Sequence, residues 1–161
     1  MGTLFFKPEG VQEAAVSVLI PELNGQRCDG CRACIDFSRF HALAFINNKP
    51  LVFDEVCHSC GGCILVCPKK ALAEKEKIIG QVQKGKSDQV TIYTGILNIG
   101  ESSGIPIIQR LLSEERTDKN KLTIVDCPPG SACMAIEGIE YADYYVLLLN
   151  LPCPVLVIWY V

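Results

Sequence analysis

The feature that most constrains this chain is a closely spaced run of cysteines that occurs twice. The complete copy follows the pattern C-x2-C-x2-C-x3-C-P and consists of Cys57, Cys60, Cys63, Cys67 and Pro68. An earlier copy contains Cys28, Cys31 and Cys34, each 29 residues before its counterpart (57 − 28). The tripeptide Ala-Leu-Ala at 42–44 recurs at 71–73 with the same separation. A repeat this regular indicates two copies of one structural unit.

The spacing of the cysteines suits iron–sulfur cubanes. Three thiolates, each separated from the next by two residues, bind three irons of one cubane, and the fourth cysteine, before proline, ligates the other cluster of the pair. This crossover predicts a first 4Fe–4S site made of Cys28, Cys31, Cys34 and Cys67. The second site has Cys57, Cys60 and Cys63, with Ser38 at the position that corresponds to Cys67. Because a serine oxygen is a harder ligand than a thiolate, we expect the second cluster to be a labile 4Fe–4S centre, a 3Fe–4S centre, or absent.

Two other uses of clustered cysteines fit the spacing less well. Structural zinc sites use two well-separated C-x2-C pairs rather than three cysteines in one loop. A disulfide framework is typical of secreted chains, and no secretory signal precedes the motif. The ten cysteines therefore predict metal binding in a reducing compartment, the cytoplasm. His41 and His58 are not needed as ligands and are expected near the clusters or at the surface.

Length and charge limit the remaining possibilities. The chain has 161 residues and a net charge of −3, which offers nucleic acid no basic surface. The final run, Tyr144–Val161, is almost wholly apolar and near the length of a membrane helix. Pro152 and Pro154 interrupt it and no basic residues flank it, so a buried strand at 144–149 with an irregular tail is favoured over a membrane span.

The order of expected elements suggests three parts: a lead-in piece at 1–22, a dicluster ferredoxin-like domain at 23–80, and a partial α/β domain at 81–161. Expected strands lie at 14–20, 44–46, 51–53, 89–93, 96–99, 122–125 and 146–149, with a hairpin turn at Asn47-Asn48. Helices are expected from Ser103 or Gly104 through Leu112, and over 133–141. This alternation of strands and helices predicts a parallel sheet.

A second chemical motif follows the expected strand at 122–125. In P-loop NTPases an acidic residue at a strand end holds the Mg²⁺ shell, and a glycine turn faces the γ-phosphate. The segment TIVDCPPG offers Asp126 and Gly130 for these roles. Taken alone, the segment favours a structural turn over a nucleotide switch, because strand, aspartate and proline turn occur together in many α/β proteins.

Together these segments resemble the MinD-type (deviant Walker) P-loop ATPases that carry an inserted dicluster ferredoxin domain. The matching segments are LFFKPE, LIPELNGQRCDGC, the two cysteine loops, GILNIGESSGIPII and TIVDCPPGSAC. The resemblance implies a ferredoxin domain inserted in a parallel-sheet P-loop domain, ATP and Mg²⁺ as cofactors, and a possible homodimer. It also implies that Asp126 and Gly130 sense the γ-phosphate, and that nucleotide turnover drives electron delivery or cluster handling.

The chain departs from that family in three respects. It lacks the loop K-G-G-x-G-K-[ST], it has Ser38 where the family has a cysteine, and its sequence after Leu149 differs. We therefore expect a fragment without the P-loop, with little affinity for ATP and no assigned catalytic residue. The expected function is an iron–sulfur electron-transfer module that serves a redox partner protein. The alternatives are a carrier or scaffold that gives clusters to client proteins, and an ATP-dependent enzyme whose P-loop is supplied elsewhere.

Overall fold

The computed structural model describes residues 6–115, 122–127, 133–140, 142–149 and 155–160. In these residues every strand pairing is antiparallel. One sheet has the order β1 (Glu9–Leu23), β4 (Leu72–Ser87), β5 (Val90–Leu97), and two hairpins pair β2 (Leu43–Ile46) with β3 (Lys49–Val52) and β6 (Tyr144–Leu149) with β7 (Val155–Tyr160). The helices are α1 (Ala33–Phe37), α2 (Gly62–Leu65), α3 (Ile105–Glu115) and α4 (Cys133–Ile139).

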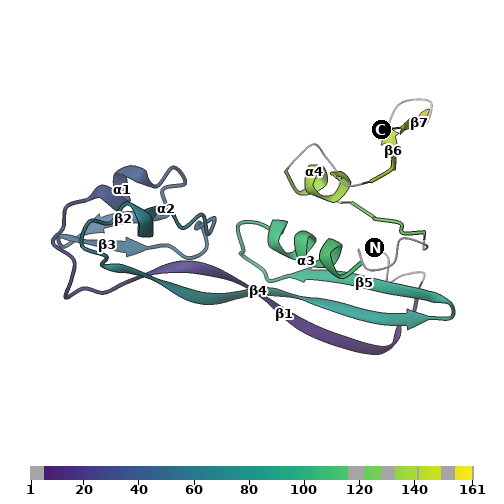
Figure 1. Ribbon diagram of the computed structural model, residues 1–161, viewed down its shortest axis with the longest axis horizontal. Helices are drawn as coiled ribbons and strands as arrows, with labels where there is room; N and C mark the ends of the chain where they lie inside the picture. Colours follow the sequence, from purple (N-terminus) through teal and green to yellow (C-terminus); the bar gives the residue numbers. More distant parts are fainter. Residues whose placement is uncertain (1–5, 116–121, 128–132, 141, 150–154, 161) are drawn as a thin grey trace.

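The pair of long strands β1 and β4 connects the two ends of the molecule. They are 15 and 16 residues long, and Figure 1 shows the lobe of α1, α2, β2 and β3 at one end of the pair and β5 with α3 at the other. We call the first of these ends the cysteine lobe (residues 24–71). Strand β1 lies at the sheet edge, where Pro21 is tolerated because its missing N–H leaves no pairing bond unmade. The domain boundaries expected after residues 22 and 80 fall inside these continuous strands.

A β-bulge interrupts the pairing of β1 with β4. Val16 pairs with Gly80 and Ser17 pairs with Ile78, so Ile79 is the extra residue. In a regular strand, residues an odd number apart point to opposite faces. The bulge instead brings residues on both sides of it to one face of the sheet.

Helix α3 covers that face and closes a hydrophobic core. The core contains Val16, Ile79, Val82 and Ile107, with Val18 and Leu111 packed against it. Ile79 and Val82 are three residues apart and share this core because of the bulge. The helix begins as the sequence predicts: Ser103 Oγ accepts a hydrogen bond from the N–H of Ile105 (3.3 Å), and the Gly104 carbonyl accepts from Ile107 and Ile108 (both 3.1 Å).

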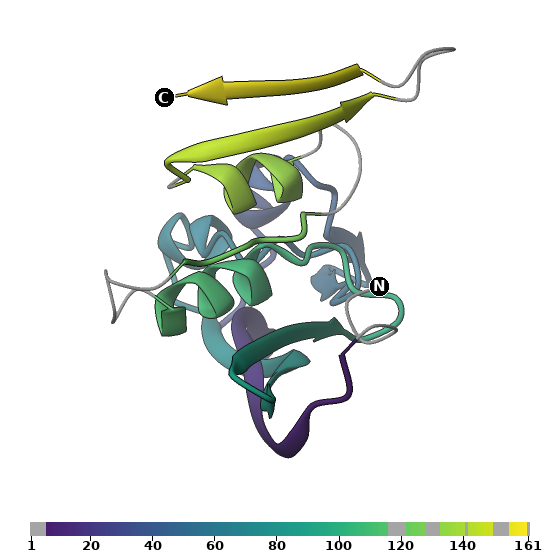
Figure 2. The ribbon, with the colours of Figure 1, turned by 90° about the vertical axis from the view of Figure 1, so that its right-hand side faces the viewer.

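Helix α4 packs on α3, and Gln109 of α3 donates a hydrogen bond to Glu137 of α4 (2.9 Å). Figure 2 shows the β6–β7 hairpin beyond α4, on the side away from the three-stranded sheet. In the described part of the chain, no helix is both long and apolar enough to cross a membrane.

The expected ferredoxin domain inserted in a parallel-sheet P-loop α/β domain is wrong as a fold class, because the described sheets are antiparallel with a few short helices. Strands β4 and β5 are joined by a two-residue turn, with Asp88 at φ 51°, instead of a crossover helix. The segment 122–127 forms no strand, and Leu122 and Ile124 are 90% and 85% exposed rather than buried. An apolar run followed by a helix was thus insufficient to indicate a crossover connection.

Two local predictions are also wrong. The two strands expected at 89–93 and 96–99 are a single strand, β5 (Val90–Leu97), and Gly95 lies within it. Its missing side chain instead admits α3: a Cβ there would lie 2.5 Å from Ile107 Cγ2 and 2.9 Å from Leu111 Cδ1. Strand β6 is not a buried strand before an irregular tail, since it pairs with β7 and Tyr144 is 62% exposed.

The close packing at Gly80 gives a test of this fold. A Cβ on Gly80 would clash with the Ile96 carbonyl oxygen and approach Ile107 Cδ1. We expect Gly80→Ala to destabilise the protein by about 1–3 kcal/mol, the usual cost of overpacking, and to lower the thermal unfolding midpoint. Gly25→Ala is the control, because a Cβ there meets only the flexible end of Lys49. Equal midpoints for the two variants would contradict the packing described.

Candidate metal centre

The two cysteine loops have the same backbone conformation. Three pairs of residues 29 positions apart have positive φ: Gly30 and Ser59 (75° and 53°), Arg32 and Gly61 (67° and 69°), and His41 and Lys70 (52° and 49°). Left-handed conformations at non-glycine residues are uncommon and costly, so their repetition is specific to the loop geometry. Arg32 and Gly61 are the residues before α1 and α2, and each helix carries the third cysteine of its loop.

The exposure of the cysteines repeats in the same way. The first cysteine of each loop is half-buried, the second is exposed, and the third is buried; the pairs are Cys28 and Cys57, Cys31 and Cys60, and Cys34 and Cys63. The third cysteines pack with Leu43 and Leu72 in a second hydrophobic core. Each loop therefore has one thiol fixed in the core and one at the surface.

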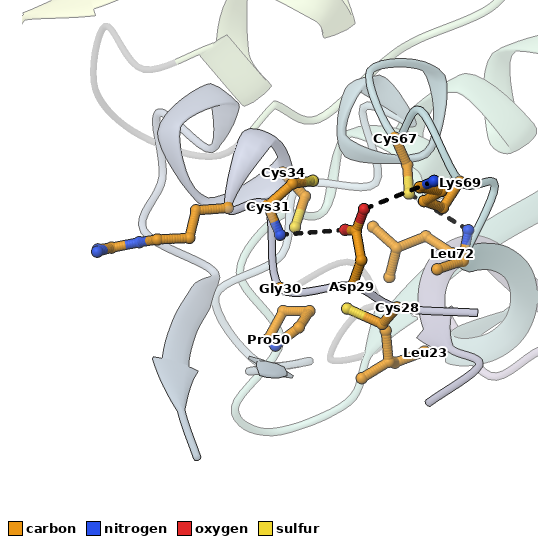
Figure 3. A pocket seen from close by; sticks show the side chains of 12 residues that line it. Leu23, Cys28, Asp29, Gly30, Cys31, Cys34, Pro50, Cys67, Lys69 and Leu72 are labelled. Atoms are coloured by element: carbon orange, nitrogen blue, oxygen red, sulfur yellow. Dashed lines mark hydrogen bonds and ion pairs between the residues drawn. The ribbon is translucent and has the colours of Figure 1, made fainter. Parts of the chain in front are cut away.

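Four of the candidate ligands line one cavity. Cys28, Cys31 and Cys34 reach it from the first loop and Cys67 from the second, with Leu23, Pro50 and Leu72 among the apolar wall residues. Figure 3 shows these side chains around the same space. The cavity thus brings together the set that the crossover predicts for the first site.

An aspartate links the two segments of this cavity. Asp29 Oδ1 accepts a hydrogen bond from the N–H of Cys31 (3.2 Å), and Asp29 Oδ2 lies 3.9 Å from Lys69 Nζ (Figure 3). Both side chains are largely exposed, so the ion pair itself contributes little stability. Its effect is to orient the first loop toward the segment that carries Cys67.

The thiols of the two third cysteines are harder to ionise than usual. Burial is the main cause that raises the pKa of Cys34, and the neighbouring Cys67 and Cys31 raise it further. Burial is also the main cause that raises the pKa of Cys63, and the neighbouring Cys57 and Cys60 raise it further. Several thiolates in one place repel each other, and a bound cation or cluster removes this repulsion as the thiols lose their protons.

Ser38 lies where the repeat expects a fourth ligand for the second loop. The N–H of Ala42 donates to Ser38 Oγ (3.2 Å), and the N–H of Ala71 donates to Cys67 Sγ (3.2 Å). The two side chains therefore accept the same local hydrogen bond at positions 29 residues apart. Ser38 Oγ is held in the orientation that Cys67 Sγ has in the other half of the lobe.

The candidate ligands lie around a cavity rather than at one point. Among the described residues, no group of three or more His, Cys, Asp or Glu converges closely enough to hold one metal ion. A zinc site needs four ligands about 2.3 Å from one atom if all are thiolates. A cubane takes one thiolate at each of four separate irons, so its ligands surround a cavity, as the four cysteines do here.

The two histidines make no contact that implies ligation. The ring of His58 stacks on Phe40, with centroids 3.9 Å apart and an interplanar angle of 18°. This stack joins the end of the first cysteine loop to the start of the second. His41 is one of the residues with positive φ.

The nucleotide-switch candidates have a different setting from the one expected. Asp126 is exposed in the non-strand segment 122–127, so the strand end that such a switch requires is missing. Gly130 lies outside the described residues. Cys127 packs against Gly138 of α4, and its pKa is raised by burial and then by Asp126.

Three residues beside the second loop were not found from the sequence. Ser102 Oγ donates to the Cys57 carbonyl (3.1 Å), and Lys77 Nζ contacts both the Asp54 carbonyl (3.2 Å) and Glu101 Oε2 (2.9 Å). They lie outside the cysteine repeat. Glu101 and Ser102 belong to the segment GILNIGESSGIPII, but no pattern in the sequence shows that they or Lys77 contact the second loop.

Comparison with known proteins gives two relatives and no function. No protein-family model matches the chain. It is 25% identical over 113 residues to the uncharacterized protein MJ0579 of Methanocaldococcus jannaschii, covering 70% of this chain and 40% of that protein. It is 30% identical over 134 residues to the uncharacterized protein MJ0578 of the same organism, and this match covers 81% of this chain and 45% of that protein. The chain thus spans less than half the length of these relatives.

The geometry at Ser38 gives a test of the second site. We expect Ser38→Cys to raise the iron content and the oxygen tolerance of a cluster on Cys57, Cys60 and Cys63, because thiolate binds this iron better than a serine oxygen does. The measurement is iron per chain and the EPR spectrum of protein prepared without oxygen. Unchanged iron and unchanged spectra would show that Ser38 does not face the second cluster.

The raised thiol pKa values predict how the metal-free protein responds to pH. Folded Cys34 and Cys63 hold their protons more tightly than the ordinary thiol, whose pKa is 9.0. The stability that these two protonated thiols contribute is therefore fully present below pH 9. It is lost as the pH rises through their pKa values in the folded protein. Urea unfolding of the reduced, chelator-treated protein from neutral to alkaline pH measures this loss. The double variant Cys34→Ala/Cys63→Ala should show a shallower decline, and an equal decline would contradict the assignment.

Proposed function

We propose that this chain is an iron–sulfur electron-transfer module of the ferredoxin type. The observation that supports it most is the cavity lined by Cys28, Cys31, Cys34 and Cys67, since a four-thiolate set from two loops is what a 4Fe–4S cluster requires. When bound, such a cluster accepts and donates single electrons. The likeness to the ferredoxin part of the MinD-type ATPases also supports the proposal.

The residues of the chain have defined tasks in this proposal. Buried Cys34 and Cys63 anchor each loop in the lobe core, while exposed Cys31 and Cys60 leave one side of each site at the surface. A redox partner protein can approach closely at that side, in the reducing environment of the cytoplasm. Hydrogen bonds and exposure around the sulfurs set the potential of such centres, and the N–H of Ala71 on Cys67 Sγ is one such bond.

Cluster delivery is the second candidate, and Ser38 is the observation that favours it. An oxygen at the fourth corner of the second site weakens the hold on one iron. A cluster bound by only three thiolates can pass more readily to a client protein. An ATP-dependent function has less support, because the described sheets are antiparallel.

The test of the proposed function is a cysteine substitution with a matched control. Protein prepared without oxygen should be brown and hold at least one 4Fe–4S cluster. Cys67→Ala should remove about one cluster per chain, since it takes a thiolate from the first site. Cys133→Ala should change nothing, because this exposed cysteine belongs to neither loop. Stoichiometric zinc with negligible sulfide would contradict the proposal.

A transfer experiment separates the two candidates. The loaded protein is mixed with a metal-free ferredoxin, and the visible spectrum of the acceptor is followed after separation. An electron-transfer module keeps its clusters, whereas a carrier loses the second one to the acceptor.

A further inference from the structure

The loop at residues 98–104 is fixed at both ends. At its start, the N–H of Asn98 donates to the Ile79 carbonyl (2.9 Å), and Asn98 Nδ2 donates to the Ile78 carbonyl (3.4 Å). These two carbonyls belong to the bulge of β4. At its end, Ser103 and Gly104 begin helix α3. The loop is therefore attached both to the sheet and to α3.

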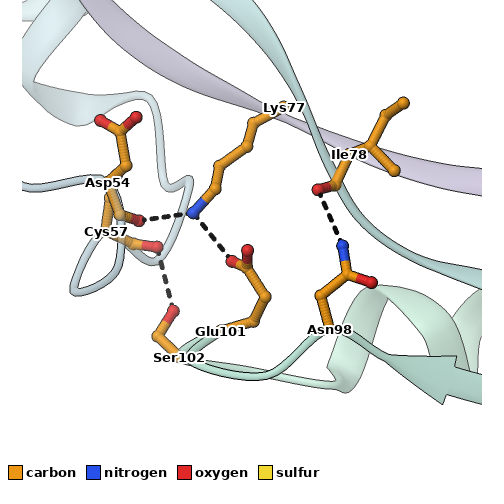
Figure 4. A network of polar contacts seen from close by, with 7 residues as sticks. All are labelled: Asp54, Cys57, Lys77, Ile78, Asn98, Glu101 and Ser102. Carbon is orange, nitrogen blue, oxygen red and sulfur yellow. Dashed lines mark hydrogen bonds and ion pairs between the residues drawn. The ribbon is translucent and has the colours of Figure 1, made fainter.

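This loop contacts the second cysteine loop directly. Figure 4 shows Ser102 Oγ donating to the Cys57 carbonyl, and Lys77 Nζ between the Asp54 carbonyl and Glu101. The Lys77–Glu101 ion pair is partly buried: its side chains are 20% and 13% exposed. Those of the Lys75–Glu22 pair on the surface are 54% and 59% exposed. Partial burial makes its geometry more constraining than that of a surface pair.

The bulge explains why Lys77 can reach this position. Val18 pairs with Lys77 and belongs to the core beneath α3. Lys77 and Ile79 are two residues apart and share a face, and the bulge turns this face to the same side as Val82. Lys77 and Val82 are five residues apart and would point to opposite faces of a regular strand, whereas the bulge at Ile79 places them on the same face.

The two cysteine loops differ in which residues hold them in place. In the described part of the chain, the polar contacts of Asp29 join Cys31 and Lys69, and so remain inside the lobe. The second loop is held at two carbonyls, of Asp54 and Cys57, by residues outside it. Cys57 is the first ligand of the second site, so its backbone position decides where that thiolate lies.

We infer that Lys77, Glu101 and Ser102 form a clamp that positions the second cysteine loop and couples helix α3 to the second iron–sulfur centre. These are positioning residues, and the inference rests on the proposed function. Because Ser38 is a poor fourth ligand, the second centre depends more than the first on how its three thiolates are held. A movement of α3 would be transmitted to Cys57 through the loop at 98–104.

The charges of the clamp give it a second property. A positive charge near a cluster favours the reduced, more negative state, and a negative charge disfavours it. Lys77→Met leaves the Glu101 carboxylate unpaired and should lower the reduction potential of the second centre. Glu101→Gln leaves the Lys77 ammonium unpaired and should raise it. Loss of structure alone would not shift the two variants in opposite directions.

The first experiment follows amide hydrogen exchange in metal-free and loaded protein by mass spectrometry. Ser102→Ala should speed exchange over residues 54–60 about fivefold, as expected for one lost hydrogen bond, and leave residues 28–34 unchanged. Ser113→Ala is the control, since its hydroxyl bonds to the Arg110 carbonyl within α3. Equal exchange in Ser102→Ala and the unaltered protein would overturn the inference.

The second experiment measures both potentials by EPR titration in a Ser38→Cys background, where the second site has four thiolates. Opposite shifts for Lys77→Met and Glu101→Gln in one centre, with the other unmoved, are the expected result. Shifts of the same sign, or equal shifts in both centres, would overturn the clamp while leaving the proposed function intact. If the unaltered protein binds no cluster at all, the proposed function fails and this inference fails with it.

Discussion

The antiparallel pairing of β1 with β4 is the interaction on which the rest of the structure depends. At one end, Leu23 pairs with Leu72, and both residues line the cavity of the first cysteine site. Further along, Val16 and Val82 of the same two strands form the core under α3. The pairing of the same two strands, with the bulge between its two parts, thus closes the cysteine lobe and supports the helix. Small lobes with few apolar residues commonly need metal or other crosslinks to be stable, so we expect this strand pairing and the proposed clusters to stabilise each other.

The bulge at Ile79 gives this strand pairing a second role. It aligns Lys77 with the core face of the sheet and lets Asn98 bond to the carbonyls of Ile78 and Ile79. The loop that starts at Asn98 then reaches Cys57 through Ser102. The two halves of an internal repeat are therefore unequal in their surroundings: the first is enclosed by its own lobe and the second is held from outside. The chemical difference at Ser38 falls in the same second site.

The cysteine lobe could be anticipated from the sequence because its constraints are local and repeated. The spacing of Cys28 to Cys34 and the turn at Asn47-Asn48, whose φ values are 51° and 62°, are each contained in a few residues. The three-stranded sheet could not be anticipated from the sequence, because strand pairing depends on partners far apart in sequence, such as Val16 and Gly80. Gly95 shows the difficulty: it falls between the two strands expected at 89–93 and 96–99, whereas it lies inside β5 and its small size serves the contact with Ile107 and Leu111. The clamp could not be predicted for the same reason, since nothing in the sequence places Lys77 and Glu101 beside the second cysteine loop.

The central claim is that Cys67 belongs to the first site although it lies in the second loop. Alkylation of the loaded protein, with each cysteine followed by peptide mass spectrometry as the clusters are slowly removed by a chelator, tests it most directly. Exposed Cys133 should react at once and serve as the internal reference. The account predicts that Cys67 becomes reactive together with Cys28, Cys31 and Cys34, and at a different rate from Cys57, Cys60 and Cys63. If Cys67 instead becomes reactive together with the three cysteines of its own loop, the crossover is contradicted.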